Sequence, residues 1–110
     1  MEIGMLSDKH RMDTVREYLA ITKDSISRVD GFSSDVQKND TLYVAILKAK
    51  DASGHLLDLD SCELPKSCIK HVLVVIDKLA LAMSEANKTR ALNSASEELK
   101  LAIEELPKIY

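Results

Sequence analysis

Apolar residues recur along most of the chain at spacings of three and four, which is the periodicity of one face of an α-helix. Four segments carry this pattern. The first runs from about Ser7 to Asp30, the second begins near Ser34, the third runs from Pro65 to about Ala86, and the fourth follows a break at residues 87–89 and stops at Pro107. Helices of about 20 residues are roughly 30 Å long. Four of them joined by short loops predict an all-α, four-helix antiparallel up-down bundle, a single domain over residues 1–110.

Each segment has one apolar seam that is expected to face the core. In chain order the seams are Met12, Val15, Leu19, Thr22, Ile26 and Val29; Leu42, Ile46, Ala49, Ser53 and Leu56, widened by Tyr43, Leu57 and Leu59; Ile69, Val72, Ile76, Leu79, Met83 and Ala86; and Leu92, Ala95, Leu99, Ala102 and Leu106. The chain has no Trp and few aromatics, so the core is expected to consist of Leu, Ile, Val, Ala and Met.

Helix ends are marked by capping residues. Ser34 has the capping-box spacing to Gln37, which predicts the start of the second helix. Gly31 suits a left-handed C-cap after the first helix. Pro65 suits the first position of the third helix, where its missing N–H costs nothing. Gly54 lies inside the second segment and predicts either a close approach of a neighbouring backbone or an early end of the helix.

Three helix starts have rivals. Ser7 or Asp13 can cap the first helix, and Asp40 is a later possible start of the second. Ser94 and Glu97 also have capping-box spacing, which would start the fourth helix later than the break at residues 87–89.

The stretch Cys68–Met83 is the least ordinary part of the pattern. Its polar residues Lys70, His71, Asp77 and Lys78 form one narrow stripe, and nearly all the others are apolar. A surface helix normally shows the reverse proportion, whereas a helix that is apolar nearly all round is buried. The third helix is therefore expected to lie at the centre of its domain or to be covered by another chain.

The residues that a bundle core does not explain are Leu73, Val74 and Leu81. With Val75, Ala80 and Ala82 beside them they would form a contiguous apolar patch, and such patches usually mark an interface. We therefore expect self-association through the third helix, most simply as a homodimer, with a heterodimer of similar helices as an open alternative. The competing interpretation buries this helix within the chain, with the residues MEIGML laid across it.

Charge and composition argue against several classes of function. The net charge is −3 with acids and bases interspersed, so a nucleic-acid interface is not expected. The third segment is shorter than a membrane span and contains Asp77 and Lys78, so we expect no membrane partner and a cytoplasmic protein. Cys62 and Cys68 form no zinc motif and are expected to be reduced thiols, although a local disulfide across the Pro65 turn is conceivable.

No pattern in the chain commits to catalysis, a cofactor or a metal. Asp51, His55 and Asp58 have a spacing compatible with metal ligands, but no other helix supplies matching carboxylates, so no metal site is predicted. The Arg followed five residues later by His that small helical ribonucleases carry is absent. The sequence predicts a non-enzymatic protein-interaction or regulatory bundle.

Two alternative functions stay open. His71 is a candidate phosphoryl acceptor of a histidine-phosphotransfer-like signalling domain, since such domains present a histidine on a bundle helix. Against this, bulky residues rather than small ones follow His71. The chain is also compatible with a non-catalytic helical partner of a toxin–antitoxin type pair.

Overall fold

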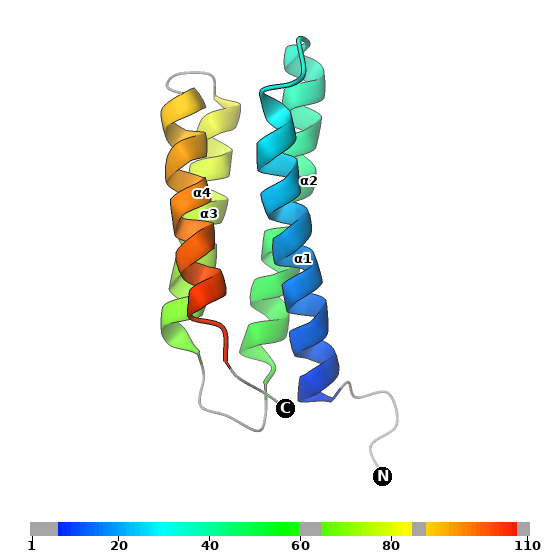
Figure 1. Ribbon diagram of the computed structural model, residues 1–110, viewed down its shortest axis with the longest axis vertical. Helices are drawn as coiled ribbons and strands as arrows, with labels where there is room; N and C mark the ends of the chain where they lie inside the picture. The colour runs from blue at the N-terminus through cyan, green and yellow to red at the C-terminus, as the bar shows by residue number, and fades with distance from the viewer. Residues whose placement is uncertain (1–6, 60–64, 85–87, 108–110) are drawn as a thin grey trace.

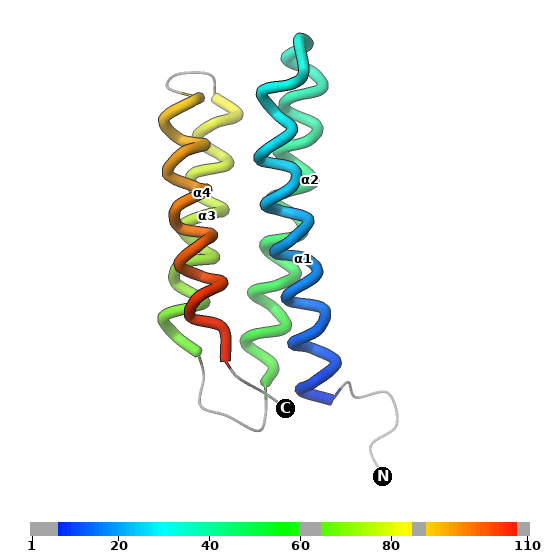
Figure 2. The backbone as a smooth tube through the Cα atoms, viewed as in Figure 1, coloured from blue at the N-terminus to red at the C-terminus, as the bar shows by residue number. Residues whose placement is uncertain are grey.

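The computed structural model describes residues 7–59, 65–84 and 88–107, and within them the protein forms four helices and no strand. The helices are α1 (Asp8–Val29), α2 (Asp35–Leu57), α3 (Lys66–Met83) and α4 (Lys88–Glu104). Helices that follow one another along the chain run in opposite directions (Figures 1 and 2). The predicted all-α four-helix antiparallel bundle is confirmed.

The four helices form two hairpins, α1 with α2 and α3 with α4, which lie side by side (Figure 1). Packing is closest inside each hairpin, and α2 against α3 joins the two. The fourth side of the bundle, α1 against α4, is packed much more loosely. The helices therefore pack closely on three sides of the bundle and loosely on the fourth.

Serine side chains cap the first two helices, as the spacing predicts. Ser7 accepts a hydrogen bond from the backbone N–H of His10 at 3.1 Å, and Ser34 accepts one from Gln37 at 3.5 Å. These bonds satisfy N–H groups that have no partner inside a helix. The starts of α1 and α2 are thus set by local sequence.

Three other predictions about helix ends are wrong. Gly31 does not adopt a left-handed conformation. Helix α1 ends with Asp30 in right-handed geometry, and the N–H of Gly31 donates to the carbonyl of Arg28 at 3.0 Å. Pro65 is the cap before α3 rather than its first residue, with ψ near 70°. Ser94 lies inside α4, which already begins at Lys88. Ala86, the expected end of the third helix, is outside the described residues.

The helix α2 passes through Gly54 without interruption and continues to Leu57. A Cβ atom built at Gly54 would meet no heavy atom within 4 Å. Neither an early helix end nor a close backbone approach explains this glycine, so both expectations are wrong. A glycine inside a helix lowers stability by up to about 1 kcal/mol relative to alanine. At Gly54 no neighbouring atom requires the side chain to be absent.

The core is made of aliphatic side chains from all four helices. The predicted seams of α1 and α2 are buried throughout, and so are Leu92, Ala95, Leu99 and Ala102 of α4. In α3 the buried face is rotated from the prediction. Val75 and Ala82 are fully buried, whereas Ile76 and Met83 are only partly covered. Tyr43 and Leu57, expected to widen the core, are exposed.

Two of the buried hydroxyl groups bond within their own helices. Thr22 Oγ1 donates to the carbonyl of Tyr18 at 2.8 Å, and Ser53 Oγ donates to that of Lys50 at 2.7 Å. Each therefore carries no unpaired polar atom into the core.

Candidate functional site

The outward face of α3 carries two of the three residues predicted to form an interface. Leu73 and Leu81 each keep 49% of their surface exposed, and Val74 between them is half-buried. Val75 and Ala82, which were expected to flank this patch, point into the core. The patch is consequently narrower than the sequence suggests, and α3 is a corner of the bundle rather than its centre.

A shallow apolar groove lies beside Leu73, between α3 and the end of α2. It encloses about 290 Å³, and its lining is Leu57, Lys66, Ile69, Lys70, Leu73, Val74 and Asp77. Leu57 on the α2 side is 55% exposed. The charged residues of this set can keep their ammonium and carboxylate groups in water while their stems border the groove. The groove is therefore suited to an apolar side chain.

The exposed apolar surface is distributed unevenly over the described residues. Large exposed apolar side chains occur on α2, α3 and α4, and none on α1. The outer surface of α1 instead carries ion pairs, Arg16 with Asp13 and Arg28 with Asp24. Because single exposed apolar residues are common, the informative feature is that two of them, Leu57 and Leu73, line the same α2–α3 groove. The sequence did not predict the contribution of Leu57.

His71 lies at the α3–α4 contact. Its Nδ1 is 2.7 Å from Glu98 Oε2, and the two side chains are only 23% and 27% exposed. Since an ionised carboxylate has no proton to give, Nδ1 is the donor. In the neutral ring Nε2 then carries the lone pair. His71 belongs to the polar stripe that the sequence predicts, but α3 turns it toward α4 and its side chain is mostly covered.

The histidine of the second helix is held by an arginine from α1. Arg11 Nη1 lies 3.2 Å from His55 Nδ1 and 3.6 Å from Asp58. The Arg11 side chain is 15% exposed, and among the described residues its Nε has no hydrogen-bond partner. The ring of Tyr18 packs near that of His55, with Lys48 4.6 Å from the centre of the Tyr18 ring. This cluster ties α1 to α2.

Arg11 also disfavours metal binding by Asp51, His55 and Asp58. The guanidinium of Arg11 donates a hydrogen bond to the imidazole nitrogen that faces it. Its positive charge also repels metal cations. Within residues 7–59, 65–84 and 88–107 no group of three His, Cys, Asp or Glu side chains is placed to hold a metal ion.

Cys68 is a buried free thiol whose Sγ donates to the carbonyl of Ala102 at 3.2 Å. Burial, and secondarily the negative charge of Glu105, raise its pKa from 9.0 to about 11. The thiolate is the reactive form of cysteine, so Cys68 is inert at neutral pH. Cys62, the other partner of the conceivable disulfide, is outside the described residues.

The raised pKa of Cys68 predicts a specific alkaline effect. Between pH 9 and about 11 the folded thiol keeps its proton while the unfolded thiol loses it. Proton release favours the unfolded state, so stability falls with rising pH across this window, by about 2 kcal/mol at most. We expect a smaller fall for Cys68→Ala, measured by urea unfolding with Cys62→Ser present in both proteins. Parallel pH profiles would contradict this assignment.

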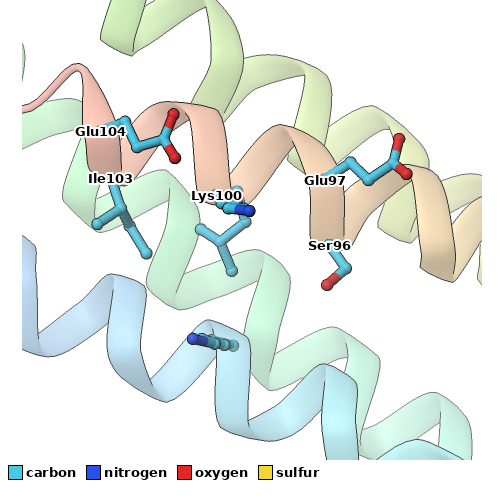
Figure 3. A pocket seen from close by; sticks show the side chains of 7 residues that line it. Ser96, Glu97, Lys100, Ile103 and Glu104 are labelled. Carbon is cyan, nitrogen blue, oxygen red and sulfur yellow. The ribbon is translucent and has the colours of Figure 1, made fainter.

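The loosely packed α1–α4 side contains a groove formed by two adjoining hollows of about 380 and 480 Å³. Both are lined by Lys23, Ile103 and Glu104. Figure 3 shows Ile103 and Ser96 directed from α4 toward α1, while Glu97 and Glu104 point away. The first hollow is lined by one hydroxyl side chain, that of Ser96, and by the charged residues Lys23, Glu97, Lys100 and Glu104.

Comparisons with known proteins give no identification: no family model, no curated protein and no solved structure matches this chain. In the part of the chain that the structure describes, no helix combines the length and the apolar character needed to cross a membrane.

Proposed function

We propose that this protein is a non-enzymatic helical bundle that binds protein, and that it associates with itself through the outward face of α3. The observation that carries the proposal is the apolar groove between Leu57 and Leu73, two leucines that are each about half exposed. Covering both on association would remove apolar surface from water, at roughly 25 cal/mol per Å² before the costs of association. Leu81 extends the same outward face by two turns.

The proposed site is an interaction surface rather than a reaction centre. Its charged residues, Lys66, Lys70 and Asp77, surround an apolar floor, which is the arrangement of a small protein interface with a polar rim. We place the protein in the cytoplasm, and the buried free thiol of Cys68 suits such a reducing compartment.

Substitution of Leu73 by glutamate tests this function. We expect the wild-type chain to sediment as a dimer in a concentration series from about 1 µM to about 1 mM. Leu73→Glu should shift the dissociation constant upward by at least about 100-fold, because a charge would be buried without a partner. Leu81→Glu should weaken association less, since Leu81 lies farther from the groove.

The matched control is Leu101→Glu, which introduces the same charge at an exposed leucine of α4 and should leave the dimer intact. Circular dichroism would verify that each variant is folded. A wild-type chain that stays monomeric throughout the series would refute self-association.

One observation favours a second candidate function, phosphoryl transfer through His71. The hydrogen bond to Glu98 fixes the proton on Nδ1 and leaves Nε2 as a nucleophile. In the step, the Nε2 lone pair would form a P–N bond as the P–O bond of an acyl phosphate breaks, and the carboxylate of the donor departs. Glu98 would stabilise the positive charge on the ring.

Incubation with acetyl phosphate and with phosphoramidate, followed by mass analysis at neutral pH, tests this second function. An acid-labile adduct on His71 that is lost in Glu98→Ala would support it. An unmodified His71 with both donors would exclude it.

A further inference from the structure

The two adjoining hollows between α1 and α4 form a groove whose halves differ in character. The hollow of about 380 Å³ has three side chains that can donate hydrogen bonds, those of Lys23, Ser96 and Lys100. The hollow of about 480 Å³ has mainly apolar lining, made of Ala20, Ile103, Leu106 and Pro107. Because Lys23 and Ile103 line both hollows, a ligand with one polar end and one apolar end would match the groove along its length.

Helix α1 supplies two cations and no acid to the lining of this groove. Arg16 and Lys23 are seven residues apart, a spacing that keeps both on one face of the helix. Arg16 pairs with Asp13, whereas no ion pair between the described residues involves Lys23. The two acids of the lining, Glu97 and Glu104, belong to α4 and point away from α1 (Figure 3). The ammonium group of Lys23 is therefore available to an anion in the groove.

The groove is narrow, because α1 and α4 still contact each other, although more loosely than the other neighbouring helices do. A helix with its side chains is about 10 Å across, so a partner helix would lie on the groove without entering it. An unbranched hydrocarbon chain is much thinner and would reach the apolar floor that Leu99 and Ile103 provide. Each hollow also falls within the range of roughly 300 to 1,000 Å³ that is usual for small-molecule sites.

We infer that the α1–α4 groove binds a free fatty acid, an unbranched acyl chain that ends in a carboxylate. The carboxylate would lie in the smaller hollow, where Lys23 supplies a positive charge. The hydroxyl of Ser96, directed toward α1 (Figure 3), would donate a hydrogen bond to it. The acyl chain would lie over Ala20 and Ile103 and end beside Leu106, where contact with apolar side chains removes it from water.

This fatty-acid site is separate from the proposed interface on α3. Its lining shares no residue with that of the α2–α3 groove, and it lies between the two helices that pack least closely. The inference therefore goes beyond the proposed function and does not rest on it. A chain that binds a fatty acid but stays monomeric, or the reverse, would separate the two.

Calorimetric titration of the full chain with dodecanoate, kept below its critical micelle concentration, tests this inference. We expect saturable binding of one dodecanoate per chain with a dissociation constant below about 1 mM. Lys23→Glu should raise that constant by about tenfold or more, because it places a like charge beside the carboxylate. Dodecyltrimethylammonium has the same alkyl chain but a positive end, and it should bind the wild type about tenfold more weakly than dodecanoate does. Lys50→Glu, an equal charge change at an exposed residue of α2, should leave dodecanoate binding unaltered.

Two substitutions on α4 form a matched pair that tests the position of the acyl chain. Ile103 and Leu101 are 38% and 40% exposed, but only Ile103 lines the groove. Ile103→Gln should raise the dissociation constant for dodecanoate by about fivefold or more, because it places an amide against the acyl chain. Leu101→Gln should bind dodecanoate as the wild type does.

Three results would overturn the inference. The first is a wild-type chain that shows no saturable binding of dodecanoate. The second is equal affinity of the wild type for dodecanoate and dodecyltrimethylammonium, which needs no variant and would mean that the positive charge of the groove selects nothing. The third is a Lys23→Glu variant, folded by circular dichroism, that binds dodecanoate as tightly as the wild type.

Discussion

Replacing Leu79 with alanine is expected to lower the free energy of unfolding by about 3 kcal/mol. Leu79 is fully buried in the core on α3. The substitution removes apolar atoms that are out of water and leaves a cavity that the neighbouring helices fill only in part. Since small domains are stable by about 5 to 15 kcal/mol, the midpoint of urea unfolding, followed by circular dichroism, should fall markedly.

The matched control is Leu73→Ala, the same change on the same helix at a residue that is 49% exposed. At concentrations where the chain is monomeric, its effect should stay within about 0.5 kcal/mol. The pair separates the inward and outward faces of α3 with one kind of substitution. Equal losses of stability would mean that Leu73 is covered within the monomer, and would contradict the orientation of α3 described above.

Ala49→Leu is expected to destabilise the protein by about 1 to 3 kcal/mol through overpacking. Ala49 is fully buried on α2, as are Ala45 and Ala52 on the same face. Small side chains there let the neighbouring helices approach α2 closely, and three additional carbon atoms would force them apart or into unfavourable rotamers.

Ala20→Leu supplies the comparison for this overpacking. Ala20 is exposed on α1, beside the loose α1–α4 groove, where a larger side chain has room. Its unfolding free energy should change by less than about 0.5 kcal/mol. A tolerated Ala49→Leu would show that the core around α2 has unfilled space.

The orientation of α1 could be predicted from sequence because it has one apolar seam and a clear polar face. The seam of α2 is also buried as predicted, although its outer surface carries exposed apolar residues such as Tyr43 and Leu57. A seam such as Met12 to Val29 admits only one rotation of the helix that buries it. The serines at both helix starts act through a bond three residues away, so their role was also readable locally.

The rotation of α3 could not be predicted in the same way. Its apolar residues surround most of the helix, so several rotations bury a similar apolar surface, and the chosen one places Val75 and Ala82 inside. For the same reason the exposed set was only partly foreseen. Leu73 and Leu81 are exposed as expected, whereas the contribution of Leu57 on α2 emerges only when the two helices are packed together.

The contacts of His71 and His55 also lay beyond the sequence. The partner of His71 is Glu98, 27 residues away, and that of His55 is Arg11, 44 residues away. Such pairs depend on the axial alignment of two helices to within about one turn. Periodicity gives the facing of a helix that has a single apolar seam, but not its height relative to its neighbour.

The side-chain hydrogen bonds and ion pairs between described helices all join α1 to α2 or α3 to α4. No directional bond among them crosses from one hairpin to the other. The boundary between the hairpins is therefore held by the packing of apolar side chains. A shift of one hairpin along the other would break none of these contacts, so we expect the bundle to yield first at this boundary under mechanical load.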